Sequence, residues 1–149
     1  MTEQQKYIIH TDGGSRGNPG PAAIGVVIEE VGGGLKKEYG EYIGETTNND
    51  AEYQAVIFAL KKFKALFGNK IAKTSETEVR ADSELLIKQL TGKYKILEPK
   101  IQLLFIAVWN LKLDFKKINF KLNPRAKNKE ADGLVNEALD GQSVSQKLF

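Results

Sequence analysis

The sequence contains no cysteine and only one histidine, His10, among its 149 residues. Disulfide bonds and thiolate metal sites are therefore excluded, so any metal ion has to be held by oxygen atoms or by that imidazole. Hard divalent cations such as Mg²⁺ and Mn²⁺ prefer oxygen ligands. Because no second histidine or cysteine accompanies His10, we interpret it as a packed or hydrogen-bonded strand residue.

Long apolar runs are also missing, since no stretch reaches the about 18 residues that a membrane-spanning helix needs. The 22 lysines and arginines slightly exceed the 19 aspartates and glutamates, which gives a formal charge of +3. This excess permits binding to an anionic backbone but does not demonstrate it. We therefore expect a soluble, cytoplasmic protein with no membrane partner, and composition leaves its function open. We also expect the protein to be a monomer.

The first half of the chain predicts a sheet that begins with hairpins. Alternating or β-branched residues predict three strands, and glycine-rich turns separate these strands. These predicted strands are Lys6–Asp12, Ala22–Glu29 and Leu35–Ile43. Apolar residues at helical spacing then predict a long helix over Asp50–Phe67.

The second half alternates between strands and helices. The predicted elements are a strand at Thr77–Asp82, helices at Ser83–Leu90 and Ile101–Leu113, a strand at Lys117–Leu122 and a helix at Asn128–Leu139. Three antiparallel strands followed by this alternation indicate an α/β fold, with one five-stranded mixed sheet and helices on both faces. We expect one domain over residues 1–149, with a core of about 6–139 and a C-terminal tail of 140–149 after the Asp140-Gly141 stop.

Four acidic residues occupy unusual places in this pattern. Asp12 and Asp82 each end a predicted strand, and the ends of adjacent parallel strands lie side by side. Glu52 and Asp132 fall on apolar stripes of their helices, so both are expected to point inward. Most of the 19 acidic residues are solvated, and a lone aspartate at a strand end is usually a turn residue, but this explanation does not cover acids on two apolar stripes.

Crowded carboxylates repel one another and are costly to bury, so cations or protons have to neutralise them. With thiolates excluded, divalent cations are the simplest solution. A site made only of carboxylates suits phosphodiester hydrolysis with two metal ions, which requires no side-chain nucleophile.

Four short motifs occur in order along the chain. They are Thr11-Asp12-Gly13-Gly14 with Gly17-Asn18-Pro19-Gly20, then Thr47-Asn48-Asn49-x-x-Glu52, then Asp82-Ser83, and finally Asn128-x-x-Ala131-Asp132. With these motifs at these strand and helix positions, the chain resembles type 1 ribonuclease H from Tyr7 to about Leu139.

The resemblance implies endonucleolytic hydrolysis of the RNA strand of RNA–DNA hybrids, which gives 5′-phosphate and 3′-hydroxyl ends. It implies that Asp12, Glu52, Asp82 and Asp132 are catalytic and hold two Mg²⁺ or Mn²⁺ ions. The candidate substrate-binding residues are Gly13, Gly14, Ser15, Asn18, Thr47, Asn48, Asn49, Lys93, Lys95 and Arg125. Of these, the asparagines are also good turn and helix-capping residues, and both roles can hold at once.

Three features depart from the family pattern. The loop before the last acid, residues 123–127, has no histidine, and neither Arg125 nor Lys127 titrates near neutrality, so slower turnover is expected. Glu84 stands where many relatives have glutamine, and it either adds charge beside the metals or faces solvent. The link after Leu90 is too short for the basic handle helix of some members, which leaves Lys93, Lys95 and Lys100 as the best basic cluster, unless these lysines only solubilise the surface.

Two alternative functions remain open at this point. A related nuclease of the same superfamily, or a domain of a reverse transcriptase, would keep the chemistry but change the substrate, and some members without the handle also cleave RNA–RNA duplexes. The alternative from another class is a catalytically silent module that binds hybrids. Four intact acids argue against it, because negative charge repels the phosphates that such a module binds.

Overall fold

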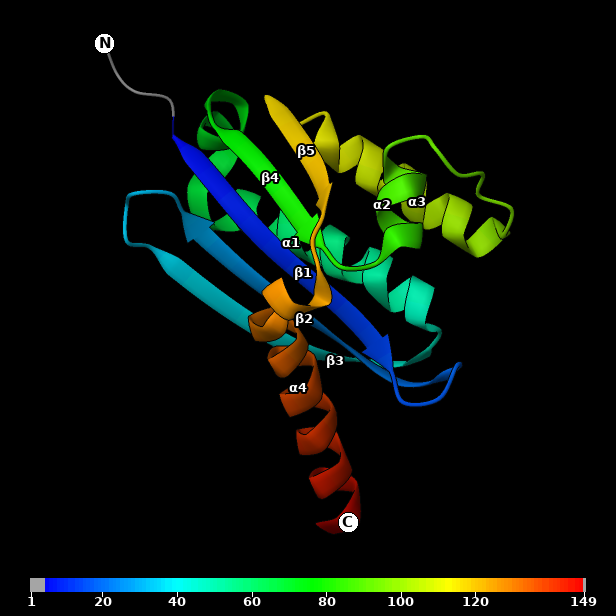
Figure 1. Cartoon of the computed structure of the whole chain (residues 1–149). Coiled ribbons are helices and arrows are strands. Elements are labelled where there is room, and N and C mark those ends of the chain that lie inside the picture. The colour runs from blue at the N-terminus through cyan, green and yellow to red at the C-terminus, as the bar shows by residue number, and fades with distance from the viewer. Residues whose placement is uncertain (1–4, 149) are drawn as a thin grey trace.

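A five-stranded mixed sheet forms the middle layer of the protein (Figure 1). The computed structural model describes the backbone of residues 5–148 and the side chains of residues 5–142. The strands are β1 (Lys6–Ser15), β2 (Gly20–Glu30), β3 (Lys36–Thr46), β4 (Glu76–Ala81) and β5 (Lys117–Leu122). Their order is β3-β2-β1-β4-β5, with β1, β2 and β3 antiparallel and β4 and β5 parallel to β1. The predicted mixed sheet is confirmed.

Helices cover both faces of this sheet, as predicted. They are α1 (Asn48–Thr74), α2 (Glu84–Leu90), α3 (Pro99–Lys112), the short 3-10 helix η1 (Arg125–Lys127) and α4 (Lys129–Leu148). In Figure 1, α4 passes in front of the sheet and α1 lies behind it. α1 packs against β1 and β2, α3 packs against α1, and α4 packs against β2 and β3. Among the described residues, no helix is long and apolar enough to cross a membrane.

The main core lies between the sheet and α1. Val56, Ala59 and Phe63 of the predicted helical stripe are fully buried there. Tyr7 of β1 contacts Phe63 edge to face, with 4.9 Å between ring centroids, and such aromatic pairs add to the stability that burial gives. A smaller cluster under α4 contains Ala23, Val135 and Leu139.

The predicted ends of α1 and α4 have different outcomes. α1 is interrupted at Gly68, where φ is 85° and ψ is 167°, so its first helical part ends at Phe67 as predicted, and a second helical stretch that buries Ala72 follows this kink. α4 does not end before Gly141, since this glycine keeps helical geometry and is not among the residues with positive φ. A glycine commonly ends a helix by adopting the left-handed conformation, which Gly141 does not do. The predicted tail of 140–149 is therefore wrong for the backbone up to Leu148, and its side chains from Ser143 on lie outside the described residues.

Gly13 lies where α1 closely approaches β1. A Cβ atom at Gly13 would overlap backbone atoms of Ala51 and Glu52. We expect Gly13→Ala to lower the free energy of unfolding by about 1–3 kcal/mol, because α1 would have to move away from β1. Chemical denaturation measures this change. Gly133→Ala in α4 is the matched control, since a Cβ there meets open space and should stabilise the helix by about 0.5–1 kcal/mol. Equal stability of Gly13→Ala and the wild type would contradict the steric explanation.

Candidate active site

Asp12 and Asp82 lie where two parallel strands separate. The pairing of β1 with β4 ends at His10 opposite Arg80, and Asp82 directly follows β4. β1 itself continues to Ser15 because its hairpin with β2 extends that far. The prediction that Asp12 ends its strand was therefore wrong, although the predicted neighbourhood of the two aspartates is confirmed.

Glu52 reaches this point from the first turns of α1. The helix is capped by Thr47, whose Oγ1 accepts a hydrogen bond from the Asp50 N–H at 3.2 Å. Glu52 is 7% exposed, on the face toward the sheet, and its Oε1 accepts a hydrogen bond from the Gly13 N–H at 2.5 Å. Its Oε2 is buried and has no hydrogen-bond partner in the described part of the chain.

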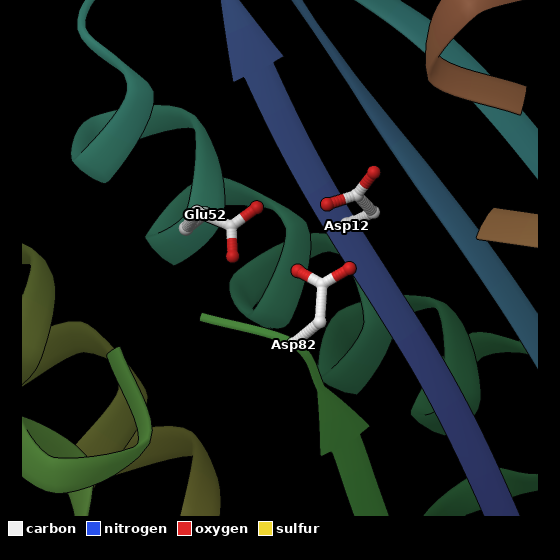
Figure 2. Close-up of side chains that lie close together, drawn as sticks. All are labelled: Asp12, Glu52 and Asp82. Carbon is white, nitrogen blue, oxygen red and sulfur yellow. The ribbon is translucent and has the colours of Figure 1, made fainter. Parts of the chain in front are cut away.

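The carboxylates of Asp12, Glu52 and Asp82 face one another (Figure 2). One oxygen from each lies within 4.8 Å of the others. Burial, opposed by a hydrogen bond with Glu52 and reinforced by the charges of Asp82 and Asp132, raises the pKa of Asp12 to about 7. Burial, followed by the charge of Asp12, raises the pKa of Glu52 well above its ordinary value. Without a cation, protons therefore neutralise part of this cluster near neutral pH.

Asp132 is placed differently from the other three acids. It is exposed and lies outside the three-carboxylate cluster, so the prediction that it points inward was wrong. α4 rests on the sheet through Ala131, Val135 and Leu139, and Asp132 is turned about 100° from Ala131 around the helix. The side chain therefore lies at the rim of the site, close enough to raise the pKa of Asp12.

A cleft of about 750 Å³ opens above the carboxylates. It is lined by all four acids and by seven predicted substrate-binding residues, Gly13, Gly14, Ser15, Asn18, Asn48, Asn49 and Arg125. The lining also includes Arg16, Glu84 and Asn136, which the sequence did not mark as binding residues because their types are common on any surface. Thr47, Lys93 and Lys95 do not line the cleft.

Hydrogen bonds join the β1–β2 turn to the start of α1 at the cleft. Asn48 Oδ1 accepts from the Ser15 N–H at 2.8 Å and from the Ser15 hydroxyl at 3.1 Å. Asn18 Oδ1 accepts from the Asn48 N–H at 3.0 Å. Since the carbonyl oxygens of both asparagines are used in these bonds, their amide N–H groups are left as donors toward the cleft.

The predicted basic cluster is divided in the structure. Lys93 and Lys95 are exposed outside the cleft. Lys100 instead lies with its Nζ 2.8 Å from Asp50 Oδ2, and the Asp50 side chain is 1% exposed. Burial alone would raise the pKa of Asp50, but hydrogen bonds with Lys100 and Gln54 outweigh it and lower the pKa. Lys100 therefore compensates a buried charge at the start of α1.

Glu84 is held at the edge of the cleft by a local pair. Lys88 Nζ lies 2.9 Å from Glu84 Oε1, and the Tyr94 hydroxyl donates to the same oxygen at 3.4 Å. The hydrogen bond with Lys88 is the main cause that lowers the pKa of Glu84. Glu84 thus lines the cleft with its charge partly balanced by Lys88.

The three clustered carboxylates fit a divalent cation. They offer only hard oxygen ligands, they lie close together, and the buried Glu52 Oε2 lacks a hydrogen bond among the described residues. Neutralisation by a cation would remove both the mutual repulsion and this unsatisfied oxygen.

Comparison with known proteins agrees with this geometry. A model of the reverse transcriptase-like family matches residues 10–138. LC11-RNase H1, solved in complex with an RNA/DNA hybrid, is 48% identical and superimposes with a TM-score of 0.85, covering 91% of this chain and 98% of that one. The chain belongs to the type 1 ribonuclease H family.

Two curated relatives of this ribonuclease H-family chain are longer proteins. Ribonuclease HI of Halobacterium salinarum is 44% identical over 129 residues, which cover 87% of this chain and 62% of the relative. A bifunctional protein of Mycobacterium tuberculosis is 37% identical over 141 residues, 94% of this chain and 37% of the relative. The chain thus spans less than two thirds of either protein.

Two loops of this ribonuclease H-family chain are those in which the sequence departs from the family pattern. The link of residues 91–98 between α2 and α3 contains no helix. In the loop before Asp132, η1 presents Arg125 to the cleft. This loop thus places a guanidinium at the cleft and contains no histidine.

Proposed function

We propose that the protein is a metal-dependent endoribonuclease that hydrolyses the RNA strand of RNA–DNA hybrids. The observation that carries the proposal is the cluster of Asp12, Glu52 and Asp82 at the base of an open cleft. The similarity to LC11-RNase H1, which was solved with an RNA/DNA hybrid, supports the choice of substrate. Crowded carboxylates do not favour plain binding of a polyanion, which supports an enzyme over a silent hybrid-binding module.

In this proposal, Asp12, Glu52, Asp82 and Asp132 hold two divalent cations, Mg²⁺ or Mn²⁺, in the substrate complex. When bound, such cations neutralise the carboxylates and supply the positive charge that phosphodiester hydrolysis requires. Glu52 is fixed for this role by its hydrogen bond to the Gly13 N–H. Asp132, at the exposed rim, is the ligand that can adjust as the substrate enters.

The chain itself orients the duplex. The amide groups of Asn18 and Asn48 and the backbone around Gly13 to Ser15 face the same cleft as the acids. These donors suit a minor groove, where 2′-hydroxyl groups identify the RNA strand. Water then adds to phosphorus as the bond from phosphorus to O3′ breaks. The oxygen of the water remains on the 5′-phosphate, and the proton that the water gives up passes to O3′, which leaves as the 3′-hydroxyl.

Further features belong to the same proposal. The protein acts as a monomer in the cytoplasm, and double-stranded RNA is the second substrate that the cleavage assay below tests. Arg125 contributes positive charge near the scissile phosphate but supplies no imidazole for proton transfer, so we propose slower turnover than in a relative with a histidine in this loop.

Cleavage of a labelled RNA strand tests this function. The strand is paired with DNA or with RNA and incubated with Mg²⁺, Mn²⁺ or a chelator. We expect cutting of the RNA in the hybrid only when a metal is present, with 5′-phosphate ends on the products. Cutting of the RNA–RNA duplex as well would widen the substrate class. Binding of the hybrid without cutting would contradict the proposed enzyme and would favour a catalytically silent module that binds hybrids.

Lys93 and Lys95 are proposed to contact the hybrid outside the cleft. Charge reversal of both to glutamate should weaken hybrid binding and reduce the slope of log affinity against log salt by about one per lysine. Binding measured across a salt series checks this. Lys70→Glu with Lys73→Glu, at the far end of α1, is the control with the same change in charge. An identical loss of slope in the control would assign the effect to net charge rather than to a contact.

A further inference from the structure

Asn128 is a buried amide beside the carboxylates. It follows η1, immediately precedes α4 and is 1% exposed. Its Nδ2 donates to the Thr11 carbonyl oxygen at 2.9 Å and lies 3.5 Å from Asp82 Oδ2. The first contact holds the residue before Asp12, and the second reaches a carboxylate of the cluster directly.

The orientation of this amide is determined by its partners. Thr11 and Asp82 both present oxygen acceptors, so a rotated amide would place Asn128 Oδ1 against a carbonyl and a carboxylate. In the observed orientation Oδ1 is buried and lacks a hydrogen-bond partner among the described residues. Buried acceptors are seldom left unsatisfied. One oxygen is therefore left unpaired while both amide hydrogens are directed toward Thr11 of β1 and toward Asp82, which follows β4.

The backbone of Asn128 extends this link to the fourth acid. Its carbonyl oxygen accepts the Asp132 N–H at 3.1 Å, and its own N–H donates to the Arg125 carbonyl at 3.0 Å. Asn128 therefore contacts the segments that carry Asp12, Asp82 and Asp132. These segments lie far apart in the sequence, and the parallel pairing of β1 with β4 has already ended at His10 opposite Arg80.

We propose that Asn128 is a positioning residue that holds Asp82, and Asp12 through Thr11, in the arrangement that binds a divalent cation. The 2.9 Å bond to the Thr11 carbonyl fixes the amide, and this places its second hydrogen 3.5 Å from Asp82 Oδ2, so that the side chain of Asp82 has a donor beside it. Outer partners of metal ligands act in this way, and their loss typically lowers metal affinity or activity by about 10–100-fold. The inference rests on the proposed function only in taking these carboxylates as metal ligands.

Titration of the full chain with Mn²⁺ alone, without nucleic acid, tests the inference by calorimetry. Asn128→Ala should raise the Mn²⁺ dissociation constant by about 10-fold or more. In hybrid cleavage, the same variant should need more metal for half-maximal rate, while its KM for the hybrid at saturating metal stays at the wild-type value. Asn128→Ser, which introduces a hydroxyl able to cap α4, should show the same loss of metal affinity with a smaller loss of melting temperature.

Val79→Ala is the matched control, because Val79 is fully buried in β4 and belongs to the main core. It should lower the melting temperature without changing Mn²⁺ affinity. Wild-type Mn²⁺ affinity in both Asn128 variants would overturn the inference, and so would failure of both to fold, which would assign Asn128 a purely structural role. A wild type that binds Mn²⁺ but cleaves no hybrid would overturn the proposed function alone.

Discussion

Replacing Asp12 by asparagine is expected to reduce hybrid cleavage by more than about 100-fold. Loss of an outer partner of a metal ligand already costs up to about that factor, and Asp12 is proposed as a ligand itself. Asparagine keeps the size of the side chain but cannot carry the negative charge that attracts a cation. Initial rates of RNA cleavage at several Mg²⁺ concentrations measure the effect.

The control for this variant is Asp114→Asn, the same substitution at an acid that pairs with Lys64 on the surface, outside the cleft. It should cleave at the wild-type rate. Retention of more than a tenth of wild-type activity in Asp12→Asn would contradict the metal-ligand role of Asp12. Far-ultraviolet circular dichroism shows whether each variant is folded.

The metal-free protein is expected to lose stability as the pH rises from about 4 to about 8. The folded-state pKa of Asp12 is raised to about 7, mainly by burial, and that of Glu52 is raised as well. A raised folded-state pKa contributes stability below the unfolded-state value of about 4, and this contribution is lost as the pH rises through the folded-state value. The loss approaches roughly 1.4 kcal/mol per pH unit for each group that binds a proton only in the folded state.

Melting temperatures in a chelating buffer, recorded across this pH range, check the decline. In Asp12→Asn the melting temperature should fall less with pH than in the wild type. The difference between the two slopes gives the contribution of Asp12 apart from that of other titrating groups. Millimolar Mg²⁺ should raise the melting temperature of the wild type more at pH 8 than at pH 5, because the cation binds the ionised site in the folded state only. Equal slopes for wild type and variant in chelator would show that Asp12 ionises normally.

Much of the architecture could be predicted from the sequence because its local patterns agree with the fold. Alternation in Lys6–Asp12 and the helical stripe through Val56 and Phe63 reflect burial on one face, which needs no knowledge of distant contacts. The same stripe placed Glu52 toward the sheet, and the structure confirms that position.

The remaining features depend on contacts that a local pattern does not contain. Asp132 follows Ala131, and one residue along a helix separates a buried position from an exposed one. Both Gly68 and Gly141 are glycines within a helical segment, where the sequence alone suggests a helix end. Gly68 leaves helical geometry, whereas Gly141 keeps it. The pairing of Lys100 with Asp50 joins residues whose nearness only the packing of α3 on α1 creates.

The bonds that Asn48 makes with Ser15 and Asn18 have a consequence for the entropy of binding. These groups lose their conformational freedom when the chain folds, so little of that loss remains when a duplex binds. These bonds also fix the distance between the β1–β2 turn and the start of α1 before a duplex binds. We therefore expect the cleft to discriminate duplexes by groove width and backbone shape, with little dependence on base sequence.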